Sequence, residues 1–234
     1  MSLKNGKRFI ELIKKREKLE GTRIIGLVLH LVTSQYAVNR NYQELSKAIS
    51  WYEGDFSIWD VRDSGKLEAF RREFLRLTQN YLASTYSLIK HTEIFRDKLD
   101  NLKLTEEYSL RLAELRNNIC IKFVRELRNY SQHLRLPMTS AKLSITKNGQ
   151  QNSNVKVERR MVLIREELMK WDGWCKDSRK YIESQKEIDL KPVFAEYQAL
   201  IKGFYDWLYR RVGELYHSQV EEFFRIEREL SQFS

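Results

Sequence analysis

The sequence has few of the residues that mark secreted or metal-binding proteins. Cysteine occurs twice in 234 residues, at Cys120 and Cys175, and each cysteine lies inside an apolar pattern. Their spacing fits no zinc motif, so we expect two buried thiols in a reducing compartment and no disulfide. Histidine, cysteine and aspartate residues nowhere have metal-ligand spacing, and we therefore expect no metal or other cofactor.

Long apolar stretches are also missing. The longest, Ile24 to Val32, is interrupted by Gly26 and His30 and is far too short to span a bilayer. The N-terminus leads into a charged helix rather than into an apolar segment with a small-residue cleavage site, so we identify no signal peptide. These absences predict a soluble, cytoplasmic protein with no membrane partner.

Proline is scarce, with two residues in the chain, and one of them, Pro137, stands at a predicted helix end. We find no repeat, no low-complexity tract and no glycine-rich phosphate loop. At this length the chain is one domain, or one domain with an extension, and buries a substantial core. The fold predicted is all-α, an up-and-down helical bundle with a small inserted β-hairpin.

Apolar residues spaced three and four apart predict most of the chain as helix. We expect the first helix to end near Glu20, with Gly21 as its stop. The segment Thr22 to Ala48 also suits a strand in its β-branched first half, and helix is the interpretation adopted. Further helices are predicted over Lys66 to Leu99, from a break at Asp100-Asn101 to Leu136, over Arg160 to Lys186 with an irregularity at Asp172-Gly173, and over Leu190 to Leu230.

Two segments are predicted to lack helix. Trp51 to Gly65 is expected to be a structured connection in which Asp63 or Ser64 caps the next helix. Apolar residues alternate on both sides of Asn148-Gly149, which indicates a β-hairpin near residues 141–158 with a mobile tip at Lys147 to Asn154. We divide the chain into an N-terminal helical extension, residues 1–62, and a helical bundle that carries the hairpin, residues 63–234.

Charge gives the first indication of a partner. The chain has 42 Lys and Arg against 32 Asp and Glu, a net charge of +10 and an isoelectric point near 9.5. Such an excess favours a polyanion, which is RNA, DNA or an anionic membrane surface. Many basic proteins bind nothing acidic, so charge alone leaves the partner open.

One predicted helix ends in a group of polar residues that suit phosphate chemistry. A polar strip formed by Lys122, Glu126, Asn129 and His133 runs beside its apolar face. Asn129 and His133 are four residues apart and therefore share one side of the helix, while Arg128 lies about 100° further round. An arginine, an amide and an imidazole at one helix end could bind a phosphate.

The stretch from Arg128 to His133, Arg-Asn-Tyr-Ser-Gln-His, resembles the Arg-x4-6-His signature of HEPN domains (higher eukaryotes and prokaryotes nucleotide-binding). A helical hairpin whose second helix ends in the motif is also similar to that family, and the resemblance covers roughly Lys66 to Lys186. Some HEPN toxins have a tyrosine two residues past the histidine. Here that position is Arg135, so control by modification of that tyrosine is not expected.

The resemblance implies a homodimer in which two motifs meet across a cleft. Many family members are metal-independent endoribonucleases of toxin–antitoxin or phage-defence systems, so RNA, an antitoxin and a nucleotidyltransferase are the partners it suggests. Other members have lost catalysis and serve as nucleotide-binding, nucleic-acid-binding or dimerisation modules. The same residues would serve binding as well as cleavage, and both functions stay open.

The residue chemistry agrees with a catalytic role. Arg128 suits stabilisation of charge on a five-coordinate phosphorus, because a guanidinium grips phosphate oxygens and keeps its charge. His133 suits proton transfer near neutral pH, and Asn129 could orient either the imidazole or the phosphate. One histidine per chain is few for acid–base catalysis, and a dimer would bring two.

Structural alternatives exist for each of these residues. Arg128 could pair with Glu126 or with a neighbouring helix as a surface charge, and His133 could be a cation that favours a helix C-terminus. His91 lies on the predicted buried face of its helix and is expected to be a core histidine. The whole chain could also be a helical interaction protein in which the motif is coincidental.

Overall fold

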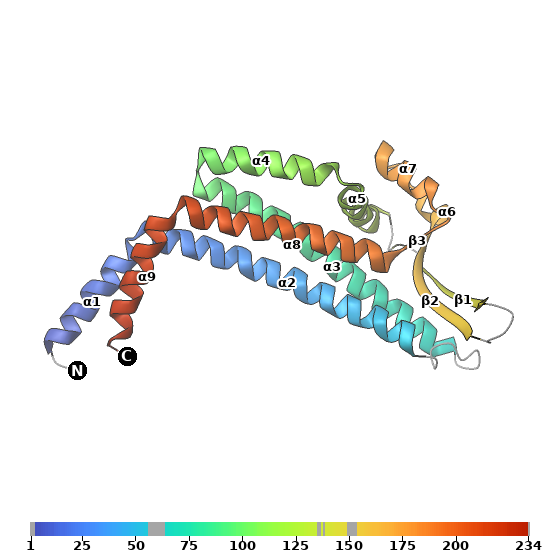
Figure 1. Cartoon of the computed structure of the whole chain (residues 1–234), viewed down its shortest axis with the longest axis horizontal. Helices are drawn as coiled ribbons and strands as arrows, with labels where there is room; N and C mark the ends of the chain where they lie inside the picture. Colours follow the sequence, from blue (N-terminus) through green and yellow to red (C-terminus); the bar gives the residue numbers. More distant parts are fainter. Residues whose placement is uncertain (1–2, 56–63, 135–136, 138, 149–153, 234) are drawn as a thin grey trace. The chain divides into compact units, whose positions relative to one another are not determined.

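The structure is a computed structural model and describes residues 3–55, 64–134, 137, 139–148 and 154–233. Its fold is all-α, as predicted: a helical bundle with a small antiparallel sheet inserted (Figure 1). The described strands are β1 (Thr139–Asn148), β2 (Asn154–Ile164) and β3 (Glu187–Asp189). The described helices are α1 (Leu3–Glu17), α2 (Glu20–Gly54), α3 (Ser64–Leu99), α4 (Leu102–Asn117), α5 (Ile119–His133), α6 (Arg165–Leu168), α7 (Lys176–Ser184), α8 (Leu190–Leu215) and α9 (His217–Ser231).

Two compact units make up the fold, and each collects separate stretches of sequence. The first unit consists of Met1–Tyr36, Leu88–Arg111 and Lys202–Ser234, and the second unit of Ala37–Ser87 and Leu112–Ile201. Our division at residue 62 stays a prediction. None of the described helices is both long enough and apolar enough to cross a membrane.

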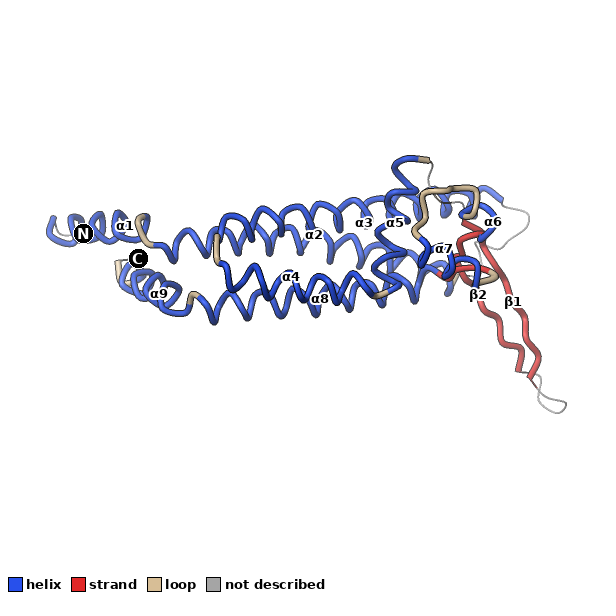
Figure 2. Tube along the Cα trace, turned by 90° about the horizontal axis from the view of Figure 1, so that it is seen from above, coloured by secondary structure: helices blue, strands red, loops and turns tan. Residues whose placement is uncertain are grey.

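In the first unit, α1 and α9 lie side by side (Figure 2). Leu12 of α1 packs with Ile226 and Leu230 of α9, and Arg16 donates a 2.9 Å hydrogen bond to Glu227. Elsewhere in this unit, Arg211 of α8 makes two hydrogen bonds to the Glu107 carboxylate of α4. Buried apolar contacts thus fix α9 against α1, and an ion pair joins α8 to α4.

We predicted that Gly21 ends the first helix, and this prediction is wrong. Helix α1 stops at Glu17, where Thr22 donates its hydroxyl to the Arg16 carbonyl, and Gly21 lies in the first turn of α2. A Cβ at Gly21 would lie 2.2 Å from the carbonyl oxygen of Gln219 in α9. The glycine is therefore required for close packing of α2 against α9 rather than for chain termination.

The second unit has a core rich in aromatic rings. Tyr52 of α2 stacks on Phe70 of α3 with 4.5 Å between ring centroids, and Tyr81 of α3 meets Phe194 of α8 edge to face. The Tyr81 hydroxyl donates to Gln198, whose amide donates to Asn39.

The segment Thr22 to Ala48, whose first half also suited a strand, is helix throughout, as we interpreted it.

The sheet confirms the predicted hairpin and lengthens it. Strands β1 and β2 pair antiparallel from Thr139 opposite Leu163 to Asn148 opposite Asn154, and β3 adds to the other edge of β2. Of the predicted tip, Lys147, Asn148 and Asn154 belong to the paired strands, and residues 149–153 lie outside the described residues, as do residues 56–63 of the predicted connection. Trp51 to Gly54, however, belong to α2, so the connection starts later than predicted.

Three predicted helices are wrong in their extent. The segment Arg160 to Ile164 is strand, because its residues pair with β1 on one side and β3 on the other. Helix starts again only at α6 and α7, with the predicted irregularity between them. The last helix divides at Tyr216 into α8 and α9. The motif helix is also divided, into α4 and α5.

Candidate functional site

Helix α5 carries the motif, and Asn118 sets where it begins. The Asn118 side chain accepts hydrogen bonds from the backbone amides of Cys120 and Ile121, at 2.7 and 3.3 Å. Such an N-cap satisfies donors that a helix start leaves unpaired. The apolar face predicted to run unbroken past Ile119 is therefore interrupted, and α5 is an independent helix of the second unit.

An aromatic cluster fixes the buried side of α5. Phe123 and Tyr130 are fully buried and both stack on Trp174, with centroid distances of 5.9 and 5.7 Å. Trp171 packs edge to face against Tyr130, and the Trp174 indole donates to the Leu168 carbonyl. Tyr130, at the centre of the motif, is thus a core residue that sets the rotation of α5.

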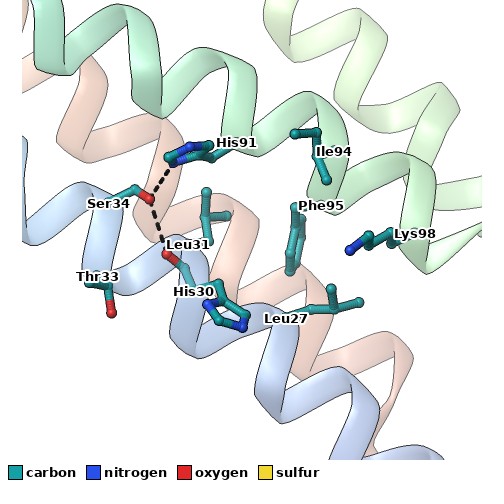
Figure 3. Close-up of a pocket in the computed structure, with 9 residues that line it drawn as sticks. All are labelled: Leu27, His30, Leu31, Thr33, Ser34, His91, Ile94, Phe95 and Lys98. Atoms are coloured by element: carbon teal, nitrogen blue, oxygen red, sulfur yellow. Dashed lines mark hydrogen bonds between the residues drawn. The ribbon is translucent and has the colours of Figure 1, made fainter.

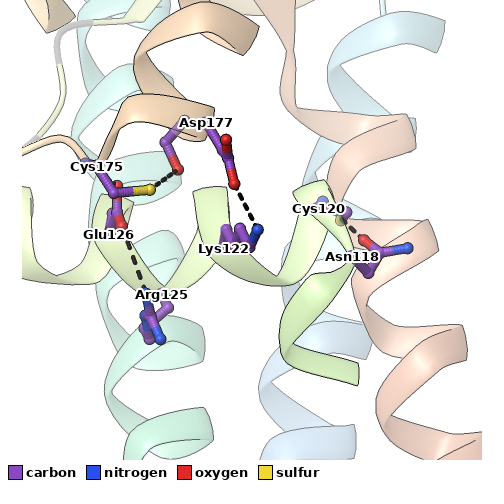
Figure 4. A network of polar contacts seen from close by, with 8 residues as sticks. Asn118, Cys120, Lys122, Arg125, Glu126, Cys175 and Asp177 are labelled. Atoms are coloured by element: carbon purple, nitrogen blue, oxygen red, sulfur yellow. Dashed lines mark hydrogen bonds and ion pairs between the residues drawn. The ribbon is translucent and has the colours of Figure 1, made fainter. Parts of the chain in front are cut away.

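Two members of the polar strip have structural roles, as Figure 4 shows. Lys122 donates a 2.5 Å hydrogen bond to Asp177 at the start of α7, and this contact lowers the pKa of the Asp177 carboxyl. Glu126 is buried and accepts a 2.9 Å hydrogen bond from the Cys175 backbone amide. Lys122 and Glu126 therefore hold α5 to the segment that begins α7, and only Asn129 and His133 of the strip remain as candidate site residues.

Arg128 has no carboxylate partner among the described residues. Its guanidinium lies over the Tyr86 ring of α3, 3.8 Å from the centroid, and Nη1 donates to the Asn129 Oδ1 at 3.1 Å. Its Nε is buried without a hydrogen-bond partner. Arg128 does not pair with Glu126, because Arg125 makes that contact, at 3.4 Å. The alternative in which Arg128 engages a neighbouring helix stands, since Tyr86 belongs to α3.

His133 is the last residue of α5 and is exposed. No hydrogen bond or ion pair joins its side chain to another described residue. Its position also suits a cation that favours the helix C-terminus, and that alternative stands. The structure thus joins Arg128 to Asn129 and places His133 one turn beyond Asn129, without a contact between His133 and either residue.

Arg128 supplies an anion-binding group near the C-terminus of α5, where the unpaired helix carbonyls themselves repel negative charge. The Arg128 guanidinium keeps its charge, is oriented by an aromatic face and an amide, and has N–H groups left to donate. The described ranges contain no group of three His, Cys, Asp or Glu side chains that could hold a metal ion.

The structure places the two cysteines differently. Cys120 is buried as predicted, its thiol donates to the Val193 carbonyl, and burial raises the pKa of that thiol to about 12. Cys175 is only partly buried and precedes α7. Both are free thiols. The high pKa keeps Cys120 protonated and therefore unreactive at neutral pH.

Tyr86 was not predicted as a site residue, and His91 does not lie where its spacing predicted. Tyr86 is a partly exposed residue of α3, 42 positions before Arg128, and no local pattern links the two. His91 is exposed rather than buried, and its Nδ1 lies 2.6 Å from the Ser34 hydroxyl of α2. Both cases depend on contacts between helices that sequence spacing does not reveal.

Comparison of the chain with protein-family models, with curated proteins and with solved structures finds no match.

Proposed function

We propose that the chain is a metal-independent endoribonuclease of the HEPN type that acts as a homodimer. The observation that carries the proposal is Arg128, a guanidinium without a carboxylate partner among the described residues, oriented by Tyr86 and Asn129. Arg128 is half-buried, and a guanidinium that is held in one orientation without a carboxylate partner can bind an anionic ligand from outside the chain. The net charge of +10 supports a polyanion such as RNA.

Each residue has a role in the proposed reaction. The RNA 2′-hydroxyl loses its proton and attacks the neighbouring phosphorus, a P–O2′ bond forms, and the P–O5′ bond breaks as the 5′-oxygen gains a proton. Arg128 stabilises the added negative charge on the phosphoryl oxygens, and His133 transfers a proton. Asn129 holds Arg128 in position. The products are a 2′,3′-cyclic phosphate and a 5′-hydroxyl.

The homodimer supplies the second proton-transfer group. The reaction removes one proton and delivers another, whereas each chain offers one histidine at the motif. His133 is exposed at the end of its helix, which favours an interface that includes the C-terminal end of α5. A toxin or phage-defence effector is the setting the resemblance suggests, with an antitoxin or nucleotidyltransferase as a further partner.

A non-catalytic nucleotide-binding, nucleic-acid-binding or dimerisation module is the second candidate. It is favoured by the absence of any contact between Arg128 and His133 among the described residues, because a binding site needs only the guanidinium and the amide. Both candidates use one site and one class of ligand. They differ in whether RNA is cut.

Incubation with a single-stranded RNA in EDTA tests the proposal. We expect cleavage to persist in the chelator and to leave 2′,3′-cyclic phosphate ends, since the RNA supplies its own nucleophile. Light scattering should give a dimer at micromolar concentration. Loss of cleavage in EDTA, or a monomer that cleaves at full rate, would contradict the mechanism. RNA that is bound but never cut would support the binding module instead.

A further inference from the structure

A pocket of about 400 Å³ lies between α2 and α3 of the first unit (Figure 3). That volume falls within the range of small-molecule sites, roughly 300 to 1,000 Å³. Its apolar lining comes from both helices, and its polar lining consists of hydroxyl, imidazole and ammonium groups. The apolar residues are Leu27, Leu31, Ile94 and Phe95, and the polar residues are His30, Thr33, Ser34, His91 and Lys98.

The polar groups of the pocket are basic or neutral. None of the nine lining residues is acidic, and the Lys98 ammonium has neither a carboxylate nor a hydrogen-bond partner among the described residues. Lys98 lies in the last turn of α3, where unpaired carbonyls would repel an anion. Arg23 of α2, whose charge is paired with Glu20, donates to the Lys98 carbonyl at 2.5 Å and so satisfies one of those carbonyls.

The apolar groups set what kind of anion fits. Leu31 and Phe95 are buried, while Ile94 is half exposed at the rim. The lining contains no asparagine, glutamine or carboxylate that could read the edge of a nucleobase, and its one phenylalanine is buried. A nucleotide would leave its polar base against leucine and isoleucine, which is unfavourable. An alkyl chain would bury apolar surface there.

The Ser34 and His91 pair at the same pocket does not indicate acyl transfer. Ser34 lies in the interior of α2, where backbone N–H groups bond within the helix and cannot form an oxyanion hole. Its hydroxyl also contacts the His30 carbonyl at 3.1 Å, and the described residues offer His91 no carboxylate to orient it. Because the Ser34 hydrogen goes to that carbonyl, Ser34 accepts from His91 Nδ1, and the pair fixes the orientation of the imidazole at the pocket.

We propose that this pocket binds an alkyl carboxylate or alkyl phosphate, with the anionic head at Lys98 and the chain on Leu31, Phe95 and Ile94. This site lies in the first unit, whereas the motif lies in the second, and the proposal does not depend on ribonuclease activity. Non-polar lining with a few positioned polar groups is typical of sites that hold such amphipathic ligands.

Isothermal titration calorimetry of the full chain with decanoate tests the head group and the chain together. We expect saturable binding of decanoate and of decyl phosphate. The ligand that binds more tightly shows whether the site prefers a carboxylate or a phosphate head group. Decanol should bind at least about fivefold more weakly, because it lacks the charge that Lys98 recognises. Adenosine monophosphate should give no saturable signal. Equal affinity for decanol, tighter binding of the nucleotide, or no saturable binding of decanoate and decyl phosphate would overturn the proposal.

Two variants with matched controls locate the site. Ile94→Glu places a like charge at the rim and should weaken decanoate binding about tenfold or more, whereas Leu110→Glu, an exposed leucine of α4 outside the pocket, should leave it unchanged. Lys98→Met should weaken binding a few fold and Lys47→Met should not. Binding that survives Ile94→Glu unchanged would show that decanoate binds elsewhere and would contradict the assignment.

Discussion

The C-terminal part of α5 and the pocket between α2 and α3 contain similar residue types but suit different ligands. Each combines a cation without a carboxylate partner among the described residues with an exposed histidine. Arg128 lies on an aromatic face and is held by an amide, whereas Lys98 stands beside a pocket lined with leucine, isoleucine and phenylalanine. The surroundings of the cation, rather than the cation itself, distinguish the two candidate sites.

Because the surroundings of the two cations differ, the ligands that the two sites suit differ in how much apolar surface they carry. A planar guanidinium fixed in orientation can make bidentate contacts to a phosphate, and α5 offers no pocket lining for an apolar body in the residues that orient it. A flexible ammonium acts as a point charge, and the pocket below it can bury a chain. We therefore assign RNA to the first site and an amphipathic anion to the second.

The largest expected effect follows from removing the imidazole at the end of α5. His133→Ala should lower the rate of RNA cleavage roughly 10²- to 10⁴-fold, the usual contribution of a positioned acid–base group. His217→Ala, which removes another exposed histidine, should leave the rate unchanged. The measurement is the initial rate of cleavage of a labelled RNA, with circular dichroism to verify folding. Equal rates for the two variants would contradict a catalytic role for His133 and leave it an ordinary surface histidine.

Salt should separate the two sites by the number of charges each ligand carries. If RNA neutralises about three cations of the protein, raising salt from about 50 to 200 mM should weaken binding roughly 20-fold, through release of counterions from the strand. Decanoate, with one charge, should respond far less. Fluorescence anisotropy of a labelled RNA measures RNA affinity, and calorimetry measures decanoate affinity. RNA affinity that is independent of salt would contradict phosphate recognition.

The aromatic face below Arg128 should have a smaller effect. Tyr86→Leu removes a cation–π contact and should slow RNA cleavage about three- to tenfold, because the guanidinium loses an orienting partner. Tyr86→Phe retains the ring and should cleave at nearly the wild-type rate. A comparison of the two variants at saturating RNA tests the contact. Equal loss in both would assign the effect to the hydroxyl.

The smallest effect is expected from the hydroxyl that contacts His91. Ser34→Ala removes one partly exposed hydrogen bond and should change the free energy of unfolding by about 1 kcal/mol or less. RNA cleavage should not change, because Ser34 belongs to the first unit and the motif to the second. Thermal unfolding and the cleavage rate, measured on the same preparation, test both statements. A large fall in cleavage would show that the two sites are not separate.

Sequence spacing predicted the long helices because their apolar residues recur regularly. It did not predict the break before α5, since the apolar pattern continues through Asn118 while the local capping signal ends it. It also misplaced His91. The buried positions around it are Leu88, Thr92 and Phe95, so a threonine takes the core position that the three-four spacing assigned to the histidine. An α-helix has 3.6 residues per turn, so a pattern of three- and four-residue steps can place the buried face one position away from where it lies.

The candidate site was predictable only in part. Arg128, Asn129 and His133 lie within six residues of one helix, so their spacing alone placed them at its end. Tyr86, which orients Arg128, and Glu126, which is buried against the segment before α7, depend on contacts between helices. The pocket is built from residues of α2 and α3 that are 57 or more positions apart, and no local pattern marks it.

The cleavage rate of Arg128→Ala, measured in EDTA beside Arg116→Ala, tests the central claim most directly. Both variants remove one exposed or half-buried arginine from the second unit, but only Arg128 has the oriented guanidinium assigned to phosphate. We expect Arg128→Ala to lose about 100-fold or more of the rate, as removal of a positioned charge stabiliser does. Arg116→Ala should retain the wild-type rate, and both should melt at nearly the same temperature. Equal rates for the two folded variants would contradict the assignment of Arg128 to RNA cleavage.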